Sequence, residues 1–499
     1  MAANPDSLRI SDVPSRARTV AFARGDGIGP EITDAVLTVM EAAGARLDLQ
    51  EVPLGRGVYE SGTRSGVDPA AWDILRGSCA FLKAPVSTPQ GGGFKSVNVT
   101  IRKSLGLFAN VRPCRSYHPF VASRHPSMDV VIVRENEEDT YAGIEHRATA
   151  EVVQCLKLVS RPGCERVIRY AFNYARDRGR RKVSCLTKDN IMKLTDGLFH
   201  EVFDEVAAGY PDLLAEHHIV DAGAARLTTR PEKFDVIVTP NLYGDILSDV
   251  AAEISGSIGL AASANVGDEF AMFEAVHGSA PDIAGRDLAN PSGLLLAGVM
   301  MLGHVGLAEE ASRVHNAWLR VLERGLHTAD IFQHGVSSRR VGTREFARAI
   351  VAELGSAPRR LQAVQYGPTR TGVRRPAHSR PPRRPRKDLV GIDVFLDWDE
   401  DGRDPVALAG RLASAGSPAL ELRMITNRGV KVWPAGLPET FRTDHWRCRF
   451  LRRDPGRPLR HAELQSLLAA ISGAGLDYVK TEHLHEFDGV PGYSSGQGE

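Results

Sequence analysis

The sequence predicts an α/β protein with a largely parallel sheet, joined to a smaller α+β domain at its C-terminal end. Apolar runs of strand length alternate with segments in which apolar residues recur at helical spacing, as in residues 129–135, 165–188 and 234–255. Helices between apolar strands are typical of parallel sheets covered on both faces. With 499 residues, 42% of them hydrophobic, the chain is long enough for at least two domains.

The first elements are predicted to be a strand, a tight turn and a helix. The run TVAFA begins at Thr19 and meets the glycine-rich turn RGDGIGPE, after which Ile32, Val36 and Val39 recur at helical spacing. Pro30 suits a first helical turn, where its missing N–H leaves no bond unmade. The glycine spacing differs from GxGxxG, so we interpret these glycines as turn-forming and not as a phosphate cradle.

Composition shifts divide the chain into four parts. Residues 356–388 combine proline, glycine and arginine with almost no apolar residues, which indicates a linker. The predicted parts are a loosely ordered lead-in (1–18), a catalytic region (19–355), the linker (356–388) and a C-terminal domain (389–499). Within the last part, residues 389–398, 404–415, 420–433 and 461–475 are expected to form a strand, a helix, a strand and a helix.

The totals favour a cytoplasmic protein without a membrane or nucleic-acid partner. The 62 basic and 61 acidic residues leave a formal net charge of +1. The six cysteines are scattered without CxxC pairs, which fits a reducing compartment, and no apolar stretch has the length of a bilayer span. The alternative is that the basic run of the linker binds a macromolecule, but that run has no interleaved aromatic residues.

Residues 91–115 and 133–146 supply side chains suited to a polyanionic substrate. Guanidinium groups bind carboxylates bidentately and stay charged at any working pH. The candidates are Ser96, Asn98, Arg102, Arg112, Arg134 and Tyr141. For any one arginine taken alone, an ordinary surface ion pair is the competing interpretation.

A second group of candidates is acidic. Asp245 and Asp249 are four residues apart on a predicted helix, which places both carboxylates on one face, where they suit Mg²⁺ or Mn²⁺. The alternative is that they are helix N-terminal acids favoured by the macrodipole. Asp221 is a third candidate carboxylate, and Lys188 follows a predicted strand at the carboxyl end, where α/β sheets hold their sites.

These segments resemble the isocitrate/isopropylmalate dehydrogenase family. The matching stretches are GDGIGPE, GGGFKSVNVTIR, ANVRP, VRENEEDTYAGIEH, TKDNIMK, NLYGDILSD, SANVGDEFAMFEAVHGSAPDIAG and NPSGLLLAGVMML. The C-terminal stretches GIDVF, RMITNRG, DHWRCRF and EFDGVPGYSSGQGE are similar to the extra domain of an extended isocitrate dehydrogenase. The resemblance implies the family's fold and the oxidative decarboxylation of isocitrate to 2-oxoglutarate and CO₂.

The resemblance also implies a role for each candidate. Ser96 and Asn98 would bind the distal carboxylate of the substrate, and Arg102, Arg112 and Arg134 its remaining carboxylates. Asp245 and Asp249, with Asp221 of a second subunit, would hold the metal. Tyr141 and the second subunit's Lys188 would transfer protons, so a homodimer with shared sites is implied, and it could pair further through the C-terminal domain. The implied cofactor contacts are Ser87, Thr88, His277, Gly278, Ser279, Ala280, Pro281, Asp282, Ile283 and Asn290.

Two choices within the family follow from these positions. By the resemblance, isopropylmalate enzymes carry a leucine where this chain has Asn98; desolvating such a polar group against a hydrocarbon would cost about 1–3 kcal/mol, which favours isocitrate. Homoisocitrate, one methylene longer, stays an alternative. NADP-dependent relatives hold lysine and tyrosine where this chain has Asp282 and Ile283, so we expect NAD to be favoured over NADP, with Arg339 or Arg340 as the phosphate ligands if this is wrong.

Two functions of other classes are alternatives. A regulatory or assembly subunit without activity would have lost an acid, the lysine or the tyrosine of the site, and this chain has them all. A macromolecule-binding module in the linker and C-terminal domain would make the chain bifunctional, but the net charge gives it no support.

Overall fold

The computed structural model describes residues 18–88, 96–367 and 384–497. Residues 1–17 of the lead-in, residues 91–95 of the substrate segment and residues 368–383 of the linker therefore lie outside the described residues, and the boundaries of these parts stay predictions. The chain divides into two compact units that are not continuous in sequence. Unit 1 comprises Met1–Tyr141, Ser160–Lys188 and Phe199–Arg375, and unit 2 comprises Ala142–Val159, Asp189–Leu198 and Pro376–Glu499.

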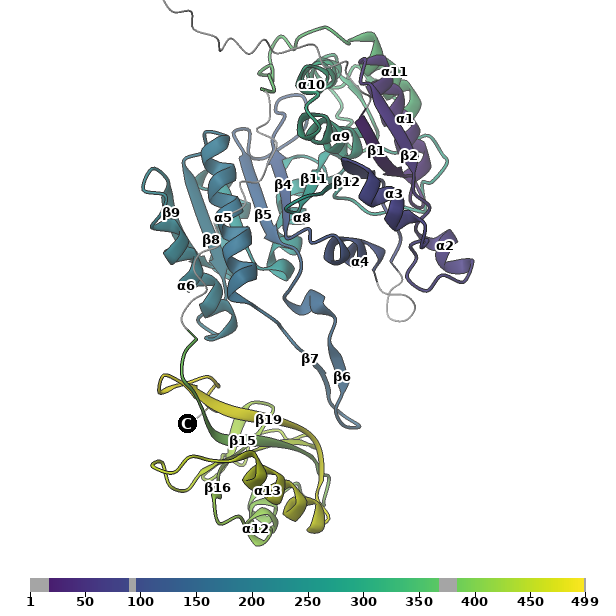
Figure 1. Cartoon of the computed structure of the whole chain (residues 1–499). Coiled ribbons are helices and arrows are strands. Elements are labelled where there is room, and N and C mark those ends of the chain that lie inside the picture. Colours follow the sequence, from purple (N-terminus) through teal and green to yellow (C-terminus); the bar gives the residue numbers. More distant parts are fainter. Residues whose placement is uncertain (1–17, 89–95, 368–383, 498–499) are drawn as a thin grey trace, which may run out of the picture. The chain divides into compact units, whose positions relative to one another are not determined.

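Unit 1 is built on one large mixed sheet (Figure 1), which confirms the predicted α/β class. Among the described residues its strands are, in spatial order, β2 (Leu47–Glu51), β1 (Arg18–Ala23), β3 (Ala80–Lys83), β12 (Ala271–Ala275), β11 (Ala262–Val266), β4 (Ala109–Arg115), β5 (Asp129–Glu135), β10 (Val236–Thr239), β8 (Lys182–Thr187) and β9 (Leu214–Ile219). Neighbouring strands are parallel except in the β12–β11, β11–β4 and β4–β5 pairs. The antiparallel centre brings β4 beside β5, and both carry predicted substrate arginines.

Helices cover the sheet, and most are amphipathic because only one face is buried. An exception is α9, SGLLLAGVMMLGH, which is apolar all round and almost wholly buried. The helices of unit 1 are α1 (Gly29–Ala42), α2 (Arg56–Glu60), α3 (Ala71–Gly77), α4 (Val97–Ser104), α5 (Arg161–Asp177), α6 (Thr195–Ala207, which begins in unit 2), α7 (Val220–Thr229), α8 (Asn241–Ser255), α9 (Ser292–His304), α10 (Ala308–Glu323) and α11 (Thr343–Ala352). The described residues include no helix that is both long and apolar enough to cross a membrane.

The glycine-rich turn before α1 brings distant segments into contact. Gly27 has φ +60°, and a Cβ there would lie 1.9 Å from the carbonyl oxygen of Ser279. Ile28 N–H donates to that same oxygen at 2.9 Å, and Asp26 N–H donates to the carbonyl of Pro85 at 2.8 Å. Position 27 therefore requires glycine, both because its backbone is in the left-handed region and because the Ser279 carbonyl leaves no room for a Cβ.

The C-terminal part of unit 2 is an antiparallel sheet with two helices on one face (Figure 1). The described strand order is β17 (Val430–Trp433), β16 (Leu420–Asn427), β18 (His445–Arg452), β15 (Lys387–Asp397), β19 (Asp477–Phe487) and β20 (Val490–Pro491), with helices α12 (Pro405–Ser414) and α13 (His461–Gly473). Apart from the short β17 and β20, this is the split βαβ arrangement of ferredoxin-like domains. The predicted α+β domain is thus confirmed, and its core includes Ile392, Trp446 and Leu467.

Two pairs of short strands and three 3₁₀ turns complete the described helices and strands. A two-stranded hairpin in unit 2 joins β6 (Glu145–Arg147) to β7 (Val153–Cys155), and β13 (Leu326–His327) pairs with β14 (Arg339–Arg340) in unit 1. Single turns of 3₁₀ helix lie at Thr140–Ala142, Pro231–Lys233 and Ile258–Leu260.

The strands β18 and β19 were not predicted, because charged residues interrupt their apolar pattern. On β18, Arg447 and Arg449 alternate with Trp446, Cys448 and Phe450, which point to the helix-covered core. Arg449 is 3% exposed and makes two 2.8 Å bonds to the carboxylate of Asp393 on β15, itself 1% exposed. An arginine that looks solvent-exposed in sequence is therefore buried in an ion pair.

We expect Asp393→Asn to destabilise the C-terminal domain by about 3–5 kcal/mol, because it leaves the buried Arg449 cation without its counter-charge. Thermal unfolding, with hydrogen exchange read over β15 and β18, measures the effect. The control is Glu421→Gln, which breaks the ion pairs of this part-exposed carboxylate with the exposed Arg423 and Arg453 and should change stability by less than about 1 kcal/mol. Equal, small shifts in both variants would contradict the prediction.

Candidate active site

Two arginines and two carboxylates meet where α8 packs on β4 and β5. Arg112 of β4 lies 3.2 Å from Asp245 through Nη2 and 3.1 Å from Asp249 through Nη1. Arg134 of β5 also forms an ion pair with Asp245. A Cβ on Gly244 would lie 2.6 Å from the Arg134 side chain, so glycine lets α8 approach this strand closely. As predicted from their spacing, Asp245 and Asp249 share one face of the helix.

Tyr141 completes this cluster from the 3₁₀ turn at Thr140–Ala142. Its hydroxyl donates a 2.6 Å hydrogen bond to Asp245, and the guanidinium of Arg134 lies 4.8 Å from the centre of its ring. Burial and the bond to Asp245 raise the pKa of Tyr141, although the Arg134 charge opposes them. The phenol therefore stays protonated at neutral pH and can act as an acid.

The charged groups of the cluster shift one another's pKa values. Burial, together with the neighbouring Arg112 and Arg102 charges, lowers the pKa of Arg134 to about 10. Burial raises the pKa of Asp245, but the charges of Arg134 and Arg112 outweigh it and leave that pKa lowered. The pKa of Asp249 is raised by desolvation and by the nearby Asp245 charge, against the effect of Arg112.

The predicted distal-carboxylate residues lie at the start of α4. Ser96 is at the N-cap position without a side-chain capping bond, and its Oγ accepts a 3.4 Å hydrogen bond from Thr88 Oγ1. The Oδ1 atom of Asn98 is buried without a hydrogen-bond partner among the described residues. Arg102, on the last turn of α4, is 7% exposed and donates at 2.7 Å to Glu274.

These arginines are held by buried polar groups that were not among the predicted site residues. Glu274 of β12 binds Arg102, accepts a 2.8 Å bond from Asn265 and pairs at 2.8 Å with Lys83 of β3. Asn110 of β4 in turn accepts a 2.6 Å bond from Arg112 Nε. The available signal was a single polar residue inside an otherwise apolar strand, as in AFLK and AMFEA.

Lys188 and Asp221 lie elsewhere along the same sheet. Lys188 follows β8, Asp221 lies in the first turn of α7, and their side chains form a 2.7 Å ion pair. Because β8 is two strands from β5, about 10 Å separates the strand ends that carry Lys188 and Arg134. The hydrogen bond from Lys188 lowers the pKa of Asp221, whose side chain is 69% exposed.

The predicted cofactor residues gather around the glycine-rich turn. Ser87 Oγ lies 2.9 Å from Ser279 Oγ, and Ser87 N–H donates at 2.8 Å to Asp26. The Nε2 atom of His277 is buried without a partner among the described residues, and burial lowers the pKa of this histidine. Asn290 is buried and donates to Asp330 at 2.9 Å. Of the other predicted contacts, Thr88, Gly278, Pro281 and Asp282 are exposed, and Ala280 and Ile283 are partly so.

The residues present fit both a divalent cation and a nucleotide. Asp245 and Asp249 offer adjacent carboxylate oxygens, the donor type that Mg²⁺ and Mn²⁺ prefer, and their mutual repulsion would be relieved by a cation. The unpaired buried nitrogen of His277 offers a hydrogen bond to a molecule seated against residues 277–283.

Comparisons with known proteins agree with this geometry. Residues 19–350 match the isocitrate/isopropylmalate dehydrogenase family, and residues 387–499 match the C-terminal domain of bacterial isocitrate dehydrogenase. A protein of Rickettsia felis, named as an NADP isocitrate dehydrogenase, is 49% identical over 96% of this chain and 99% of its own. A Thermus thermophilus protein of the same name is 44% identical over 95% of each chain. A crystal structure of a Thermus thermophilus protein superposes with a TM-score of 0.91 at 43% identity, over 97% of this chain and 96% of that one.

The prediction that NAD is the favoured cofactor is wrong, because the relatives matched over nearly the whole chain carry NADP in their names. The prediction rested on repulsion between Asp282 and a 2′-phosphate. Asp282 is exposed, where solvent and salt screen such repulsion.

With its two family matches covering both the large mixed sheet and the ferredoxin-like domain, this chain belongs to the isocitrate/isopropylmalate dehydrogenase family.

Proposed function

We propose that this chain is an NADP-dependent isocitrate dehydrogenase that oxidises and decarboxylates isocitrate to 2-oxoglutarate. The observation that carries the proposal is the convergence of Arg112, Arg134, Tyr141, Asp245 and Asp249 in one cluster. The names of the relatives matched over nearly the whole chain support the same reaction and cofactor. A cytoplasmic location is part of the proposal, supported by the scattered cysteines of the sequence.

The substrate choice follows from the charge and polarity of the cluster. Three arginines suit three carboxylates, since each guanidinium can bind one carboxylate bidentately. Arg102 belongs to the set because its charge acts on both Asp245 and Tyr141. Ser96 and Asn98 present polar atoms where isopropylmalate would place a hydrocarbon, which supports isocitrate.

The cluster also suits the chemistry. Asp245 and Asp249, with Asp221 of the partner subunit, would hold Mg²⁺ or Mn²⁺, which when bound supplies positive charge next to the C2 hydroxyl and the developing enolate. The partner subunit's Lys188 would assist the loss of the hydroxyl proton as hydride leaves C2 for nicotinamide. After loss of CO₂ from the β-keto acid, the Tyr141 hydroxyl would deliver a proton to C3. Its raised pKa keeps this hydroxyl protonated at neutral pH, as a proton donor requires.

A homodimer with shared sites is part of the proposal. Large apolar side chains are exposed in the two segments that follow Tyr141 and Lys188: Val153, Leu158, Ile191 and Leu194 are 66%, 45%, 64% and 50% exposed. On α8, Ile246 is 56% exposed beside Asp245. Exposed apolar groups that border a functional cluster are typical of protein interfaces.

For the 2′-phosphate of NADP we propose Arg340 on β14. The chain just beyond it is bonded to the cofactor segment, because Arg344 N–H donates to Asp287 at 2.9 Å and Thr343 N–H donates to the Asp287 carbonyl at 3.3 Å. Both arginines are exposed, but Arg339 forms an ion pair with Glu345, which makes Arg340 the better candidate. A guanidinium matches the geometry of phosphate oxygens.

We expect Asp245→Asn to lower kcat/KM for isocitrate by about a hundredfold or more, since it removes a metal-binding charge and keeps the side-chain shape. Mg²⁺ binding, followed by calorimetry, should weaken in parallel. Glu253→Gln, an exposed change on the same helix, is the matched control and should leave both quantities unchanged. Wild-type turnover by Asp245→Asn at saturating Mg²⁺ would disprove the assignment.

Mixing the inactive variants Arg134→Ala and Lys188→Ala should restore activity. If subunits exchange freely, half of the dimers contain one subunit of each variant. In such a dimer one of the two sites carries neither lesion, so roughly a quarter of wild-type activity is expected. Initial rates after mixing measure the recovery, and each variant alone is the control. No recovery after demonstrated subunit exchange would show that the sites are not shared.

Arg340→Ala should raise the KM for NADP by about tenfold to a hundredfold and leave the KM for NAD nearly unchanged, because only NADP carries the phosphate. Arg348→Ala, on the exposed face of α11, serves as the control. A wild-type preference for NAD would contradict the proposed cofactor. Equal effects of Arg340→Ala on both cofactors would remove Arg340 from the phosphate site.

A further inference from the structure

The residues between β5 and the active-site tyrosine are tied to the start of α8 by two hydrogen bonds inside unit 1. Asn241 Nδ2 donates at 3.3 Å to the carbonyl of Glu138, and Leu242 N–H donates at 2.9 Å to Oδ2 of Asp139. Both donors belong to the first turn of α8, the helix that also carries the two predicted metal carboxylates. These bonds therefore join the tyrosine turn to that helix across 103 residues of sequence.

Asp139 supplies an acceptor that the start of α8 does not provide for itself. The first N–H groups of a helix have no carbonyl partner within the helix. The N-cap residue of α8 is Pro240, whose side chain has no hydrogen-bonding atom, and no side-chain cap forms there. The Asp139 carboxylate takes the place of such a cap, and its negative charge suits the positive end of the helix dipole.

The same carboxylate also binds the beginning of the tyrosine turn. Asp139 is 2% exposed, and its Oδ1 atom accepts a 2.8 Å bond from Thr140 N–H. Thr140 is the first residue of the 3₁₀ turn in which Tyr141 lies. Each oxygen of the buried carboxylate therefore accepts a bond from a different element, one from the tyrosine turn and one from α8.

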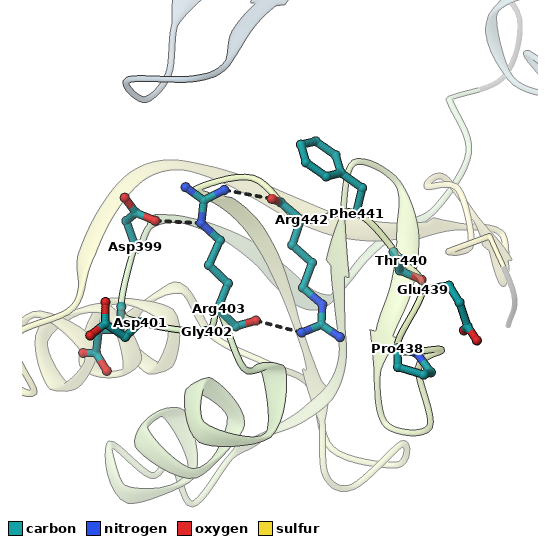
Figure 2. Close-up of a pocket in the computed structure, with 10 residues that line it drawn as sticks. Asp399, Asp401, Gly402, Arg403, Pro438, Glu439, Thr440, Phe441 and Arg442 are labelled. Atoms are coloured by element: carbon teal, nitrogen blue, oxygen red, sulfur yellow. Dashed lines mark hydrogen bonds and ion pairs between the residues drawn. The ribbon is translucent and has the colours of Figure 1, made fainter.

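The backbone of Asp139 is in the left-handed region, with φ +66°. Few non-glycine residues adopt this conformation, and aspartate and asparagine do so most easily. A comparable residue is Arg403 of the C-terminal domain, with φ +44°, which is bonded to Asp399 at 2.6 Å and to the carbonyl oxygen of Arg442 at 2.8 Å (Figure 2). At Asp139 the long-range bond comes from α8, so the shape of the turn is coupled to its contact with that helix.

The two joined segments meet again at the proposed reacting groups. Tyr141 follows Asp139 by two residues. Asp245 follows Leu242 by three residues, which is about one helical turn. The Tyr141 hydroxyl donates to Asp245 at 2.6 Å. These four residues therefore form a closed ring of backbone and hydrogen bonds, and all of them belong to unit 1.

We propose that Asp139 is a positioning residue, whose carboxylate fixes the Tyr141 hydroxyl beside Asp245 and thereby aligns it for proton delivery to C3 of the substrate. The inference rests on the proposed function of Tyr141. Asp139 acts through the tyrosine, because its two oxygens bind the backbone N–H groups of Thr140 and Leu242. A misplacement of about 1 Å can lower a rate by about a hundredfold, so a small shift of the turn is sufficient.

The test uses the full-length enzyme and the variant Asp139→Gly, which removes the carboxylate and leaves a residue that adopts positive φ freely. Two rates are measured: NADPH formation in the first turnover with isocitrate and NADP, and exchange of the C3 protons of 2-oxoglutarate with D₂O in the presence of Mg²⁺ and NADPH. In the exchange, the Tyr141 oxygen gives its own proton to solvent and takes a proton from C3. The resulting enolate then takes up a deuteron at C3, with no net oxidation.

We expect Asp139→Gly to lower the C3 exchange rate by about tenfold to a hundredfold. First-turnover NADPH formation should stay within about twofold of wild type, because hydride leaves C2 before the step in which Tyr141 gives its proton. Asp139→Asn keeps one acceptor oxygen and tolerates the left-handed backbone. Because asparagine caps a helix about as well as aspartate, this variant should keep the exchange rate within about threefold of wild type.

The matched control is Asp235→Gly, which also removes a carboxylate that binds backbone N–H groups. Asp235 accepts bonds from Arg181 N–H at 2.6 Å and from Lys182 N–H at 3.3 Å. It directly precedes β10, at the opposite end of that strand from α8. Asp235→Gly should therefore lower the thermal stability and leave the C3 exchange rate unchanged.

The wild type and Tyr141→Phe are measured first, because they test the proposed function separately. A wild type that does not turn over isocitrate would overturn the proposed function, and exchange that survives Tyr141→Phe would overturn the role of the tyrosine.

Three outcomes would overturn the role of Asp139 itself. These are wild-type exchange in Asp139→Gly, an equal fall in its first-turnover NADPH formation, or an equal loss of exchange in Asp235→Gly. If Asp139→Gly does not fold, Asp139→Ser, whose hydroxyl is one bond shorter than the carboxylate, is measured in the same way. Wild-type exchange in that variant would overturn the proposal equally.

Discussion

Burial of the Arg134 guanidinium is the constraint on which the active-site arrangement depends. Its side chain is 1% exposed at the end of β5, so its charge must be met by protein groups or by a ligand. Asn241 Oδ1 accepts two of its bonds, at 2.9 and 2.7 Å, and Asp245 neutralises it. Both partners lie on the first turns of α8, so the same requirement fixes the helix against the sheet and aims Asp245 at the Tyr141 hydroxyl.

A second buried charge cluster supports the other side of the site. Glu274 lies between Lys83 and Arg102, each at most 8% exposed, and its pKa is lowered because these cations outweigh the effect of burial. Removing any one of the three would leave an uncompensated charge in the core. Arg102 is therefore held on α4 by the central sheet, and its distance from Asp245 depends on the pairing of β3 with β12.

Features that depend on the spacing of nearby residues could be predicted from the sequence. Features that depend on contacts between residues far apart in the sequence could not. Asp245 and Asp249 were placed on one helix face because four residues make about one turn. Lys83 and Glu274 are register partners 191 residues apart, and no periodicity in either strand indicates their contact. Likewise, residues 142–159 are attached to the C-terminal domain by hydrogen bonds from Thr149 and Glu151 to Asp444, which look like ordinary surface polar residues in sequence. The cofactor prediction failed because it considered the charge of Asp282 alone, although this side chain is exposed to solvent.

Charge balance explains why the cluster holds more cations than carboxylates. Arg102, Arg112 and Arg134 exceed Asp245 and Asp249 by one positive charge, and the repulsion among the arginines contributes to the lowered pKa of Arg134. In the proposed dimer, the charges of the partner subunit's Lys188 and the partner subunit's Asp221 cancel each other, so the excess of one positive charge remains. Isocitrate with its three carboxylates, together with one divalent cation, carries a single negative charge. Bound together they would neutralise the site, whereas either alone would leave it charged in a partly buried position. The cluster therefore favours the metal–substrate pair over its separate components.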